Sequence, residues 1–254
     1  WTPAPDARKR PVIVWLHGGG FSSGNSIEQN GYSGENLSRY GDVVFCSVNH
    51  RLNAFGFSDF SKVGGEAFKN SGNVGLLDII AALRWVHDNI ENFGGDPSNV
   101  TIIGQSGGGS KVSAIATMPL AKGLIHKAVA LSGNSVKAGD PEYSAALGAF
   151  ILEEAGLEPS EIGVLQEMPW EDYLELANRA VAKFNQQYEG QSIRGGFGPV
   201  ADGIVLPDDI YFNANDPSIP DVPMIYCTTF HEWNPNRDLP QMEGISLDDV
   251  VKQL

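Results

Sequence analysis

The chain has 254 residues, of which 42% are hydrophobic and 9% aromatic, so it is long enough to bury one large core. Its 31 acidic residues outnumber the 17 basic ones, and the net charge of −14 argues against nucleic acid or an anionic membrane surface as a partner. The sequence holds no apolar run of transmembrane length, no Cys/His spacing typical of zinc and no glycine pattern typical of phosphate or dinucleotide binding, so neither a membrane span nor a metal or other cofactor is expected.

The first predicted element is a buried strand at residues 12–16, which runs directly into a loop of three glycines. The loop begins with His17 and continues with Gly18, Gly19 and Gly20. Consecutive glycines after a buried strand leave backbone N–H groups unpaired and unobstructed, and such groups bind anions. Taken alone, a triple glycine is more often a flexible loop, so its significance depends on the rest of the chain.

Short strands alternate with helices along the rest of the chain. Apolar residues recur at helical spacing between residues 76 and 90, which predicts one long amphipathic helix with Asn73 as its cap and Gly94 at its end. Short apolar runs predict buried parallel strands at residues 43–48, 100–103, 128–131 and 222–226. Cys46 and Cys227 fall at these strands and are expected to be buried free thiols. The alternation predicts an α/β doubly wound sheet with its site at the carboxyl ends of the strands.

A serine stands at the turn between the strand at 100–103 and the next predicted helix. It is Ser106, the central residue of the pentapeptide GQSGG at residues 104–108, and the helix that follows is stopped by Pro119. Such a serine needs small neighbours, because its backbone is strained and a nearby side chain would block the approaching carbonyl group. The pattern predicts an exposed nucleophile, whereas a glycine-rich turn without chemistry is the alternative.

The glycine loop and the serine turn together favour acyl transfer. In that reaction the carbonyl oxygen becomes an oxyanion, and each preorganised donor around it contributes about 3 kcal/mol. One donor comes from the residue after the nucleophile, and the others come from a glycine loop earlier in the chain. Gly19, Gly20 and Gly107 are therefore the candidate oxyanion-hole residues, with Ser106 as the candidate nucleophile.

Further landmarks accompany these two motifs at residues 1–5, 48–52, 73–78, 93–101 and 197–203. Together they make the chain resemble the type-B carboxylesterase family, which includes bacterial carboxylesterases, liver esterases, cholinesterases and neuroligins. The elbow with Gln105 and Gly107 is similar to that of bacterial members, since many animal members have Glu and Ala at these places. The resemblance implies an α/β-hydrolase fold, with a mostly parallel central sheet and helices on both faces, and a serine carboxylesterase that needs no cofactor.

The resemblance also implies a Ser-Glu-His triad in the intact protein, with Glu232 as the candidate acid. Glu232 follows the predicted strand at 222–226, in a segment similar to the one that carries the family's glutamate. Its distance from Ser106 along the chain is what the resemblance leads one to expect. A solvated loop glutamate is the alternative interpretation, and Asp78 and Asp202 are weaker candidates.

None of the five histidines fits the role of the base, which must lie within hydrogen-bond reach of the serine. His231 directly precedes Glu232, and adjacent residues of an extended segment point in opposite directions. The other four fall in the glycine loop, at a strand end, inside the long helix and before a strand: they are His17, His50, His87 and His126. In the family the catalytic histidine comes far downstream of the glutamate, so we expect the base to lie outside this chain.

The last third of the chain contains a helical block at residues 141–188, with predicted breaks near Gly156 and at Pro169. In the family, such insertions line the substrate gorge. Residues 246–249 resemble a capping box, and little helix follows it. We interpret residues 1–254 as one partial α/β-hydrolase domain, cut at both ends, which is expected to expose sheet edges and to be poorly stable and inactive alone.

The sequence therefore predicts a carboxylic-ester hydrolase that acts through a serine acyl-enzyme on a small-molecule ester. One alternative is a non-catalytic binding or adhesion relative, or an inactive truncated remnant; the presence of Ser106 and Glu232 argues against it. Another is the hormone-sensitive-lipase group, which shares the His-Gly-Gly-Gly loop. That group usually has an acidic residue before the serine and an aspartate as the third triad member, whereas this chain has Gln105 and Glu232.

Overall fold

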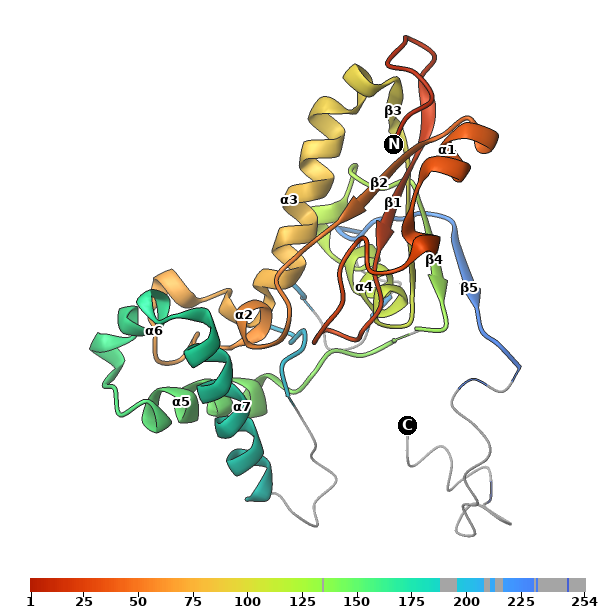
Figure 1. Cartoon of the computed structure of the whole chain (residues 1–254). Helices are drawn as coiled ribbons and strands as arrows, with labels where there is room; N and C mark the ends of the chain where they lie inside the picture. Colours follow the sequence, from red (N-terminus) through yellow and green to blue (C-terminus); the bar gives the residue numbers. More distant parts are fainter. Residues whose placement is uncertain are drawn as a thin grey trace.

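A parallel five-stranded sheet forms the centre of the molecule (Figure 1). The computed structural model describes residues 1–133, 135–187, 196–207, 211–212, 217–230, 232 and 246. The strand order is β2-β1-β3-β4-β5, and every neighbouring pair is parallel. The strands are β1 (Arg10–Leu16), β2 (Val44–Val48), β3 (Gly95–Gln105), β4 (Lys127–Leu131) and β5 (Met224–Cys227). All five strands predicted from apolar runs are confirmed, and their arrangement is that of a doubly wound α/β fold.

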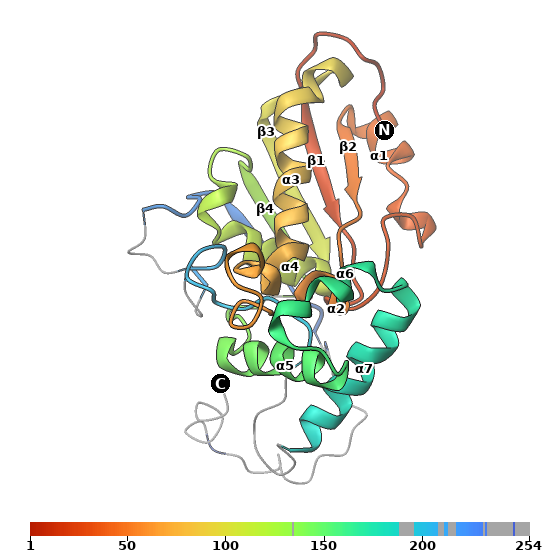
Figure 2. The same ribbon diagram turned by 90° about the vertical axis from the view of Figure 1, so that its left-hand side faces the viewer.

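Helices cover both faces of the sheet. Helix α1 (Glu35–Gly41) lies on one face, while α3 (Val74–Asn89) and α4 (Gly107–Ala116) lie on the other, as Figure 1 and Figure 2 show from two sides. The short helix α2 (Asn53–Phe57) follows β2. Short 3-10 helices are η1 (Asn30–Tyr32), η2 (Glu66–Phe68), η3 (Ser71–Asn73), η4 (Ile90–Phe93), η5 (Pro119–Ala121) and η6 (Pro159–Glu161). The long amphipathic helix predicted before Gly94 is thus confirmed as α3, which is extended by η4.

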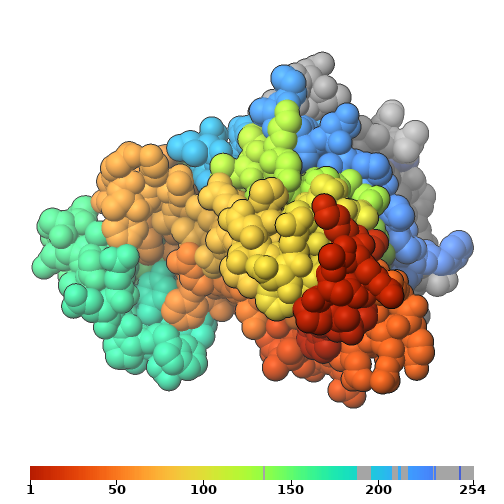
Figure 3. Space-filling model, turned by 90° about the horizontal axis from the view of Figure 1, so that it is seen from above, coloured from red at the N-terminus to blue at the C-terminus, as the bar shows by residue number. Residues whose placement is uncertain are grey.

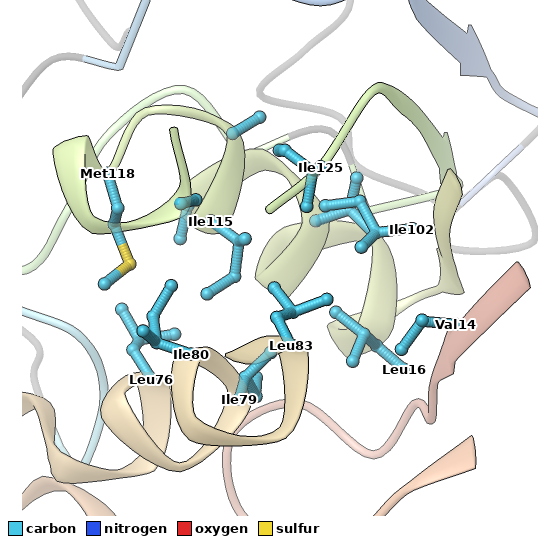
Figure 4. Packing of buried hydrophobic residues seen from close by; sticks show 14 of the residues in the cluster. Val14, Leu16, Leu76, Ile79, Ile80, Leu83, Ile102, Ile115, Met118 and Ile125 are labelled. Carbon is cyan, nitrogen blue, oxygen red and sulfur yellow. The ribbon is translucent and has the colours of Figure 1, made fainter. Parts of the chain in front are cut away.

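The main hydrophobic core lies between the sheet and the two helices α3 and α4. Because side chains alternate along a strand, Val14 and Leu16 of β1 point to this core and are fully buried. Figure 4 shows Ile80 and Leu83 of α3 facing Ile115 of α4. Each such side chain contributes about 1.5–3 kcal/mol through burial. The core therefore fixes α4 on the sheet, and with it the turn that precedes α4.

The remaining described helices form a second hydrophobic cluster at one side of the sheet. They are α5 (Pro141–Glu154), α6 (Gly163–Glu167) and α7 (Trp170–Gln186), and we call them the helical lobe. Seen from above, this green-to-teal lobe stands beside the part that contains the sheet (Figure 3). Helix α5 begins at Asp140, whose side chain accepts hydrogen bonds from the next turn, with Pro141 in the first helical position. Among the helices described, none is both long enough and apolar enough to cross a bilayer.

Asn73 stands at the predicted N-cap position of α3, but its side chain makes no capping hydrogen bond. Asn73 is fully buried, and its amide nitrogen donates to the Val200 carbonyl at 2.8 Å and to Asp202 Oδ2 at 2.9 Å. Its amide oxygen accepts from the Val200 N–H at 3.0 Å. Since a buried amide needs partners, this tertiary contact replaces the local cap and ties the start of α3 to the segment around Val200.

The expectation of two buried thiols is wrong for Cys227. Cys227 is exposed, because in the described part of the chain β5 is the outer strand of the sheet beside β4. Its neighbours Ile225 and Tyr226 are 62% and 45% exposed. Cys46 of β2 is half-buried, and burial raises the pKa of its thiol. The capping box predicted at residues 246–249 lies outside the described residues, apart from Ser246.

Candidate active site

Ser106 lies at the turn between β3 and α4 in a backbone conformation that serine rarely adopts. Its φ of 57° and ψ of −124° fall outside the regions that L-residues favour, and such a conformation costs about 1–3 kcal/mol. Two backbone hydrogen bonds fix the turn. The Ser106 N–H donates to the Leu131 carbonyl at 2.8 Å, and the Ser106 carbonyl accepts from the Ser110 N–H at 3.1 Å. The structure therefore contains a strained strand-to-helix turn at the position that the GQSGG motif indicates.

Glycines bring the first turn of α4 into contact with the glycine loop after β1. A Cβ atom on Gly107 would lie 2.3 Å from the Gly20 nitrogen, and one on Gly108 would lie 2.1 Å from the Leu16 carbonyl oxygen. Real Cβ atoms essentially never come closer than 3.0 Å, so neither position accepts a side chain without a shift of the backbone. The structure thus brings Gly107 and Gly20 together immediately beside Ser106.

The backbone N–H groups of the glycine loop are not used in hydrogen bonds within the loop. Gly19 and Gly20 have φ values of 81° and 63°, and the Gly19 carbonyl accepts from the N–H groups of Ser22 and Ser23. Within the part of the chain that the structure describes, the N–H groups of Gly19 and Gly20 donate to no acceptor. Gly107 is the first residue of α4, whose leading N–H groups have no partner inside the helix. These three groups are free to bind an anion.

Helix α2 holds the loop in place through Asn53. The Asn53 N–H donates to the Phe21 carbonyl at 2.7 Å, and its side-chain amide donates to the Ser22 carbonyl at 3.2 Å. The ring of Phe21 packs edge-on against Phe57, with their centroids 5.3 Å apart. Asn53 has a φ of 46°, a conformation that asparagine tolerates better than most residues. The sequence reasoning missed this contact, since a five-residue helix has no periodic pattern that could reveal it.

A buried group of basic side chains lies under the loop. Lys111 of α4 has no exposed surface, and its Nζ donates to the His17 carbonyl at 2.9 Å. The rings of His17 and His50 lie 4.9 Å apart. Burial lowers the pKa of Lys111 to about 7 and that of His50 to about 4, and it also lowers the pKa of His17. Sequence reasoning missed Lys111, although it is the only charged residue between Gly107 and Met118.

Glu232 lies beyond the carboxyl end of β5, two strands away from the strand that carries Ser106. Because β3, β4 and β5 are parallel, both residues stand at the same edge of the sheet. Glu232 is exposed, and its Oε1 accepts from the Thr229 N–H at 2.7 Å while its own N–H donates to Thr229 Oγ1 at 3.1 Å. Its neighbour His231 lies outside the described residues.

The two weaker acid candidates are engaged in structural contacts. Asp78 forms an ion pair with Arg51, whose Nε and Nη2 donate to it at 2.9 and 2.7 Å. This pairing lowers the pKa of Asp78 against the opposing effect of burial. Asp202 accepts from three successive backbone N–H groups, those of residues 204–206, and from the Asn73 amide. In the described residues, no group of three or more His, Cys, Asp or Glu side chains could hold a metal ion.

Three of the histidines that the structure describes bond to other groups, whereas both ring nitrogens of His50 have no hydrogen-bond partner among the described residues. His87 bonds to Asp88 at 2.9 Å, and His126 Nδ1 accepts from the Val100 N–H at 3.2 Å. His17 and His50 lie beneath the loop, and the former bonds through Nδ1 to the Gly18 carbonyl at 2.9 Å. No hydrogen bond joins any of these four described histidines to Ser106.

A cavity of about 570 Å³ opens beside the glycine loop. The loop contributes Phe21, the helical lobe contributes Tyr143, and the segment before Val200 contributes Phe197. A larger cavity of about 640 Å³ lies between α2 and the end of the lobe that contains α6, and it includes no residue of the loop. Of these two cavities, the smaller one is next to the glycine loop, because Phe21 and Ser22 directly follow Gly20, although Ser106 itself does not line it.

Comparison with known proteins relates this site to esterases. A family model described as "Carboxylesterase family" matches residues 1–246. The para-nitrobenzyl esterase of Bacillus subtilis is 36% identical over 259 residues, which cover 99% of this chain and 50% of that enzyme. A solved carboxylesterase of Geobacillus stearothermophilus matches with a TM-score of 0.77 and 34% identity, over 100% of this chain and 52% of the other. A solved esterase of Clostridium hathewayi matches with a TM-score of 0.76 and 41% identity, over 100% and 50%.

Proposed function

The chain belongs to the carboxylesterase family and has its α/β-hydrolase fold, and on that premise we propose that the intact protein hydrolyses carboxylic esters through a covalent acyl-enzyme on Ser106. The observation that carries the proposal is the strained backbone of Ser106 beside unpaired loop N–H groups. Such a turn weakens the fold but exposes a nucleophile next to donors for an anion. Because the chain spans about half the length of the relatives it matches, the activity is proposed for the intact protein.

The reaction begins when Ser106 Oγ attacks the ester carbonyl carbon and the carbonyl oxygen takes up negative charge. The N–H groups of Gly19, Gly20 and Gly107 bind that oxyanion, and each donor is worth about 3 kcal/mol of transition-state stabilisation. The alcohol leaves with a proton from the base, and the acyl group stays on Ser106. Water then attacks the acyl-enzyme and releases the acid.

Two further groups complete the proposed triad. Glu232 orients and stabilises a histidine, which takes the serine proton and later activates water. The position of Glu232 at the same sheet edge as Ser106 supports this role. We propose that the histidine is outside this chain, because none of the four described histidines is hydrogen-bonded to Ser106 and His231 directly precedes Glu232.

The cavity beside the loop suggests the kind of ester that the protein accepts. Phe21, Phe197 and Tyr143 give part of it an aromatic lining that suits a neutral apolar acyl or alcohol group, beside the charged Lys137 and Asp140. Tyr143 belongs to the helical lobe, so we propose that residues 141–188 act as a substrate-lining insertion of a single catalytic domain. The Bacillus subtilis relative is named for para-nitrobenzyl esters, which makes small aryl and benzyl esters the first compounds to test.

The decisive experiment replaces the nucleophile in the full-length protein. Ser106→Ala should reduce hydrolysis of p-nitrophenyl butyrate by about 10⁴-fold or more, because the acyl-enzyme cannot form. Ser98→Ala, at the opposite end of β3, should leave the rate unchanged and serves as the matched control. Retained turnover in Ser106→Ala would exclude Ser106 as the nucleophile.

A fluorophosphonate probe tests the same serine without a substrate. The probe forms a bond between Ser106 Oγ and phosphorus and releases fluoride, and it requires a base to remove the serine proton. Full-length protein should be labelled stoichiometrically, whereas the isolated 254-residue chain should not react. Labelling of the isolated chain at Ser106 would show that a base is supplied from within it. Absence of labelling in an intact, folded protein would favour a non-catalytic binding role.

A further inference from the structure

Lys111 is a buried cation without a nearby counter-charge. Its side chain has no exposed surface, and its one described hydrogen bond runs from Nζ to the His17 carbonyl. Within the described residues no carboxylate comes within ion-pair distance of it, and Glu28 attracts it only from further away. The ring of Phe21 lies 5.8 Å from the ammonium nitrogen. A buried ammonium that lacks an ion-pair partner is costly for the fold, so its presence calls for a reason other than stability.

The position of Lys111 on α4 adds to that cost. Lys111 is one turn after Gly107, the first residue of the helix, so it lies near the positive end of the helix dipole, where a further positive charge is unfavourable. Helical side chains lean toward the N-terminus of their helix, which carries the ammonium back toward the glycine loop. Gly108 packs against the same carbonyl, since a Cβ atom built on it would lie 3.0 Å from the His17 oxygen.

The carbonyl group that accepts the hydrogen bond of Lys111 lies close to Ser106. The His17 carbonyl belongs to the peptide group that continues into Gly18, and a Cβ atom built on Gly18 would lie 3.6 Å from Ser106 Cβ. The ammonium therefore lies against the peptide group between His17 and Gly18, and Gly18 is a close neighbour of Ser106. The two neighbouring imidazoles, His17 and His50, have lowered pKa values and are mainly neutral at pH 7. Lys111, with a pKa of about 7, is protonated in about half of the molecules at that pH and carries the positive charge of this cluster.

We infer that Lys111 is a positioning residue of the active site: it holds the glycine loop through the His17 carbonyl, and its positive charge favours the oxyanion that forms on the other side of that loop. The inference rests on the proposed function, because only an acyl-transfer intermediate places a negative charge there. When Ser106 Oγ bonds to the carbonyl carbon, the C=O electron pair moves to oxygen and the serine proton moves to the base. Lys111 gives up no proton in this step: in the molecules in which it is protonated, it provides a positive field from a fully buried position.

The test uses the full-length protein and two neutral replacements. Lys111→Met keeps the length and volume of the side chain but removes the charge, and Lys111→Gln keeps an N–H donor for the His17 carbonyl without the charge. Ser113→Ala changes another fully buried polar side chain of α4 and is the matched control. For each variant kcat and KM for p-nitrophenyl butyrate, the inhibition constant of an alkyl trifluoromethyl ketone, and Tm are measured. The ketone forms a tetrahedral oxyanion on the serine, whereas bound ester carries no such charge.

We expect both Lys111 variants to lose about 10- to 100-fold in kcat, somewhat less than loss of a direct oxyanion donor causes, with KM nearly unchanged. The inhibition constant of the ketone should rise by a similar factor. Lys111→Met should keep or raise Tm, since it removes a buried unpaired charge. Ser113→Ala should leave kcat, KM and the inhibition constant as in the wild type.

Three results would overturn the inference. The first is a folded Lys111→Met variant with unchanged kcat and unchanged affinity for the ketone. The second is a Lys111→Gln variant with wild-type values of both. The third is a fall in Tm together with a lower kcat and a KM raised by a similar factor. Either of the first two results would show that the charge of Lys111 does not contribute to the reaction. The third would show that Lys111 has a structural role. A wild-type protein without Ser106-dependent hydrolysis would instead refute the proposed function itself, and the Ser106→Ala comparison separates that outcome from a failure of the Lys111 inference alone.

Discussion

Glu232 can be tested by a change of a single atom. Its Oε1 accepts from the Thr229 N–H, and a glutamine at this position keeps an oxygen for that bond. Because the residue is exposed, Glu232→Gln should change the free energy of unfolding by less than about 0.5 kcal/mol. It should lower kcat by about 10²–10⁴-fold, since the histidine loses the negative charge that orients and stabilises its protonated form.

The measurement is kcat with p-nitrophenyl butyrate alongside urea unfolding of the full-length protein. Glu175→Gln on α7 removes a comparably exposed carboxylate far from the sheet edge and should affect neither quantity. If Glu232→Gln is silent in both measurements, the acid of the triad is a different residue.

Single residues also differ in how far their roles can be predicted from the sequence. The strained turn at Ser106 and the unpaired loop N–H groups could be predicted as structural features, because short-range spacing determines both. Lys111 could not, because its burial depends on α4 packing against the end of β1, a contact between residues 94 positions apart. The side-chain partners of Asn73 could not be predicted either, because they stand 127 and 129 positions away along the chain.

At the scale of elements, the contact between α4 and β1 depends on the absence of a side chain at Gly108. Alanine usually stabilises a helix by about 1 kcal/mol relative to glycine. Here an alanine Cβ would meet the Leu16 carbonyl oxygen at 2.1 Å, so α4 would have to move away from the sheet. Gly108→Ala should therefore destabilise the protein by about 1–3 kcal/mol, and activity should fall because the oxyanion loop shifts.

For Gly163→Ala, at the start of α6, we expect the opposite effect on stability. A Cβ atom there meets nothing within 4 Å, so the substitution should raise the free energy of unfolding by up to about 1 kcal/mol. Urea unfolding of the two variants compares the sites directly. Equal effects of the same sign would contradict the close approach of α4 to β1.

Elements themselves were predictable where their patterns are long or strongly apolar. The five strands and α3 follow from apolar runs and helical spacing, because burial on one or both faces imposes those patterns. Helix α2 is too short to show a period, yet it holds the glycine loop through Asn53. The exposure of β5 could not be predicted either, since an apolar strand sequence does not reveal whether a neighbouring strand covers its outer side.

At the scale of the whole molecule, the candidate substrate cavity lies where the sheet-bearing part meets the helical lobe. Phe197 packs against both hydrophobic clusters, and the Asn73 amide ties the segment that follows it to the start of α3. The cavity walls therefore come from both parts. A shift of the helical lobe relative to the sheet would therefore alter the shape of the cavity without moving Ser106.

The stability of the molecule should depend on pH through its buried basic groups. The pKa of Lys111 is about 7 in the fold against 10.5 for an exposed lysine. Between these values the unfolded chain holds a proton that the folded chain has lost, so stability rises with pH across this window and the full penalty applies below pH 7. For His50, with a pKa of about 4 against 6.5, stability falls as pH drops from 6.5 to 4.

The free energy of unfolding from urea titrations between pH 5 and pH 10 tests this expectation, in wild type and in Lys111→Met. The variant should lack the rise above pH 7, which amounts to about 3–5 kcal/mol at most. It retains the other groups of the cluster, His17, His50 and the more distant Glu28, so the difference between the two curves isolates Lys111. Parallel curves would mean that Lys111 keeps an ordinary pKa in the fold.

The strained backbone of Ser106 also sets the stability of the fold against the proposed chemistry. Glycine adopts a φ of 57° without steric cost, so replacement by glycine would relieve the turn and raise the stability of the fold. In a lineage that had abandoned catalysis, such a substitution would be neutral or beneficial and would spread by drift. Ser106 therefore carries a cost in stability that glycine would remove, and the proposed role of its hydroxyl group as nucleophile gives that cost a reason.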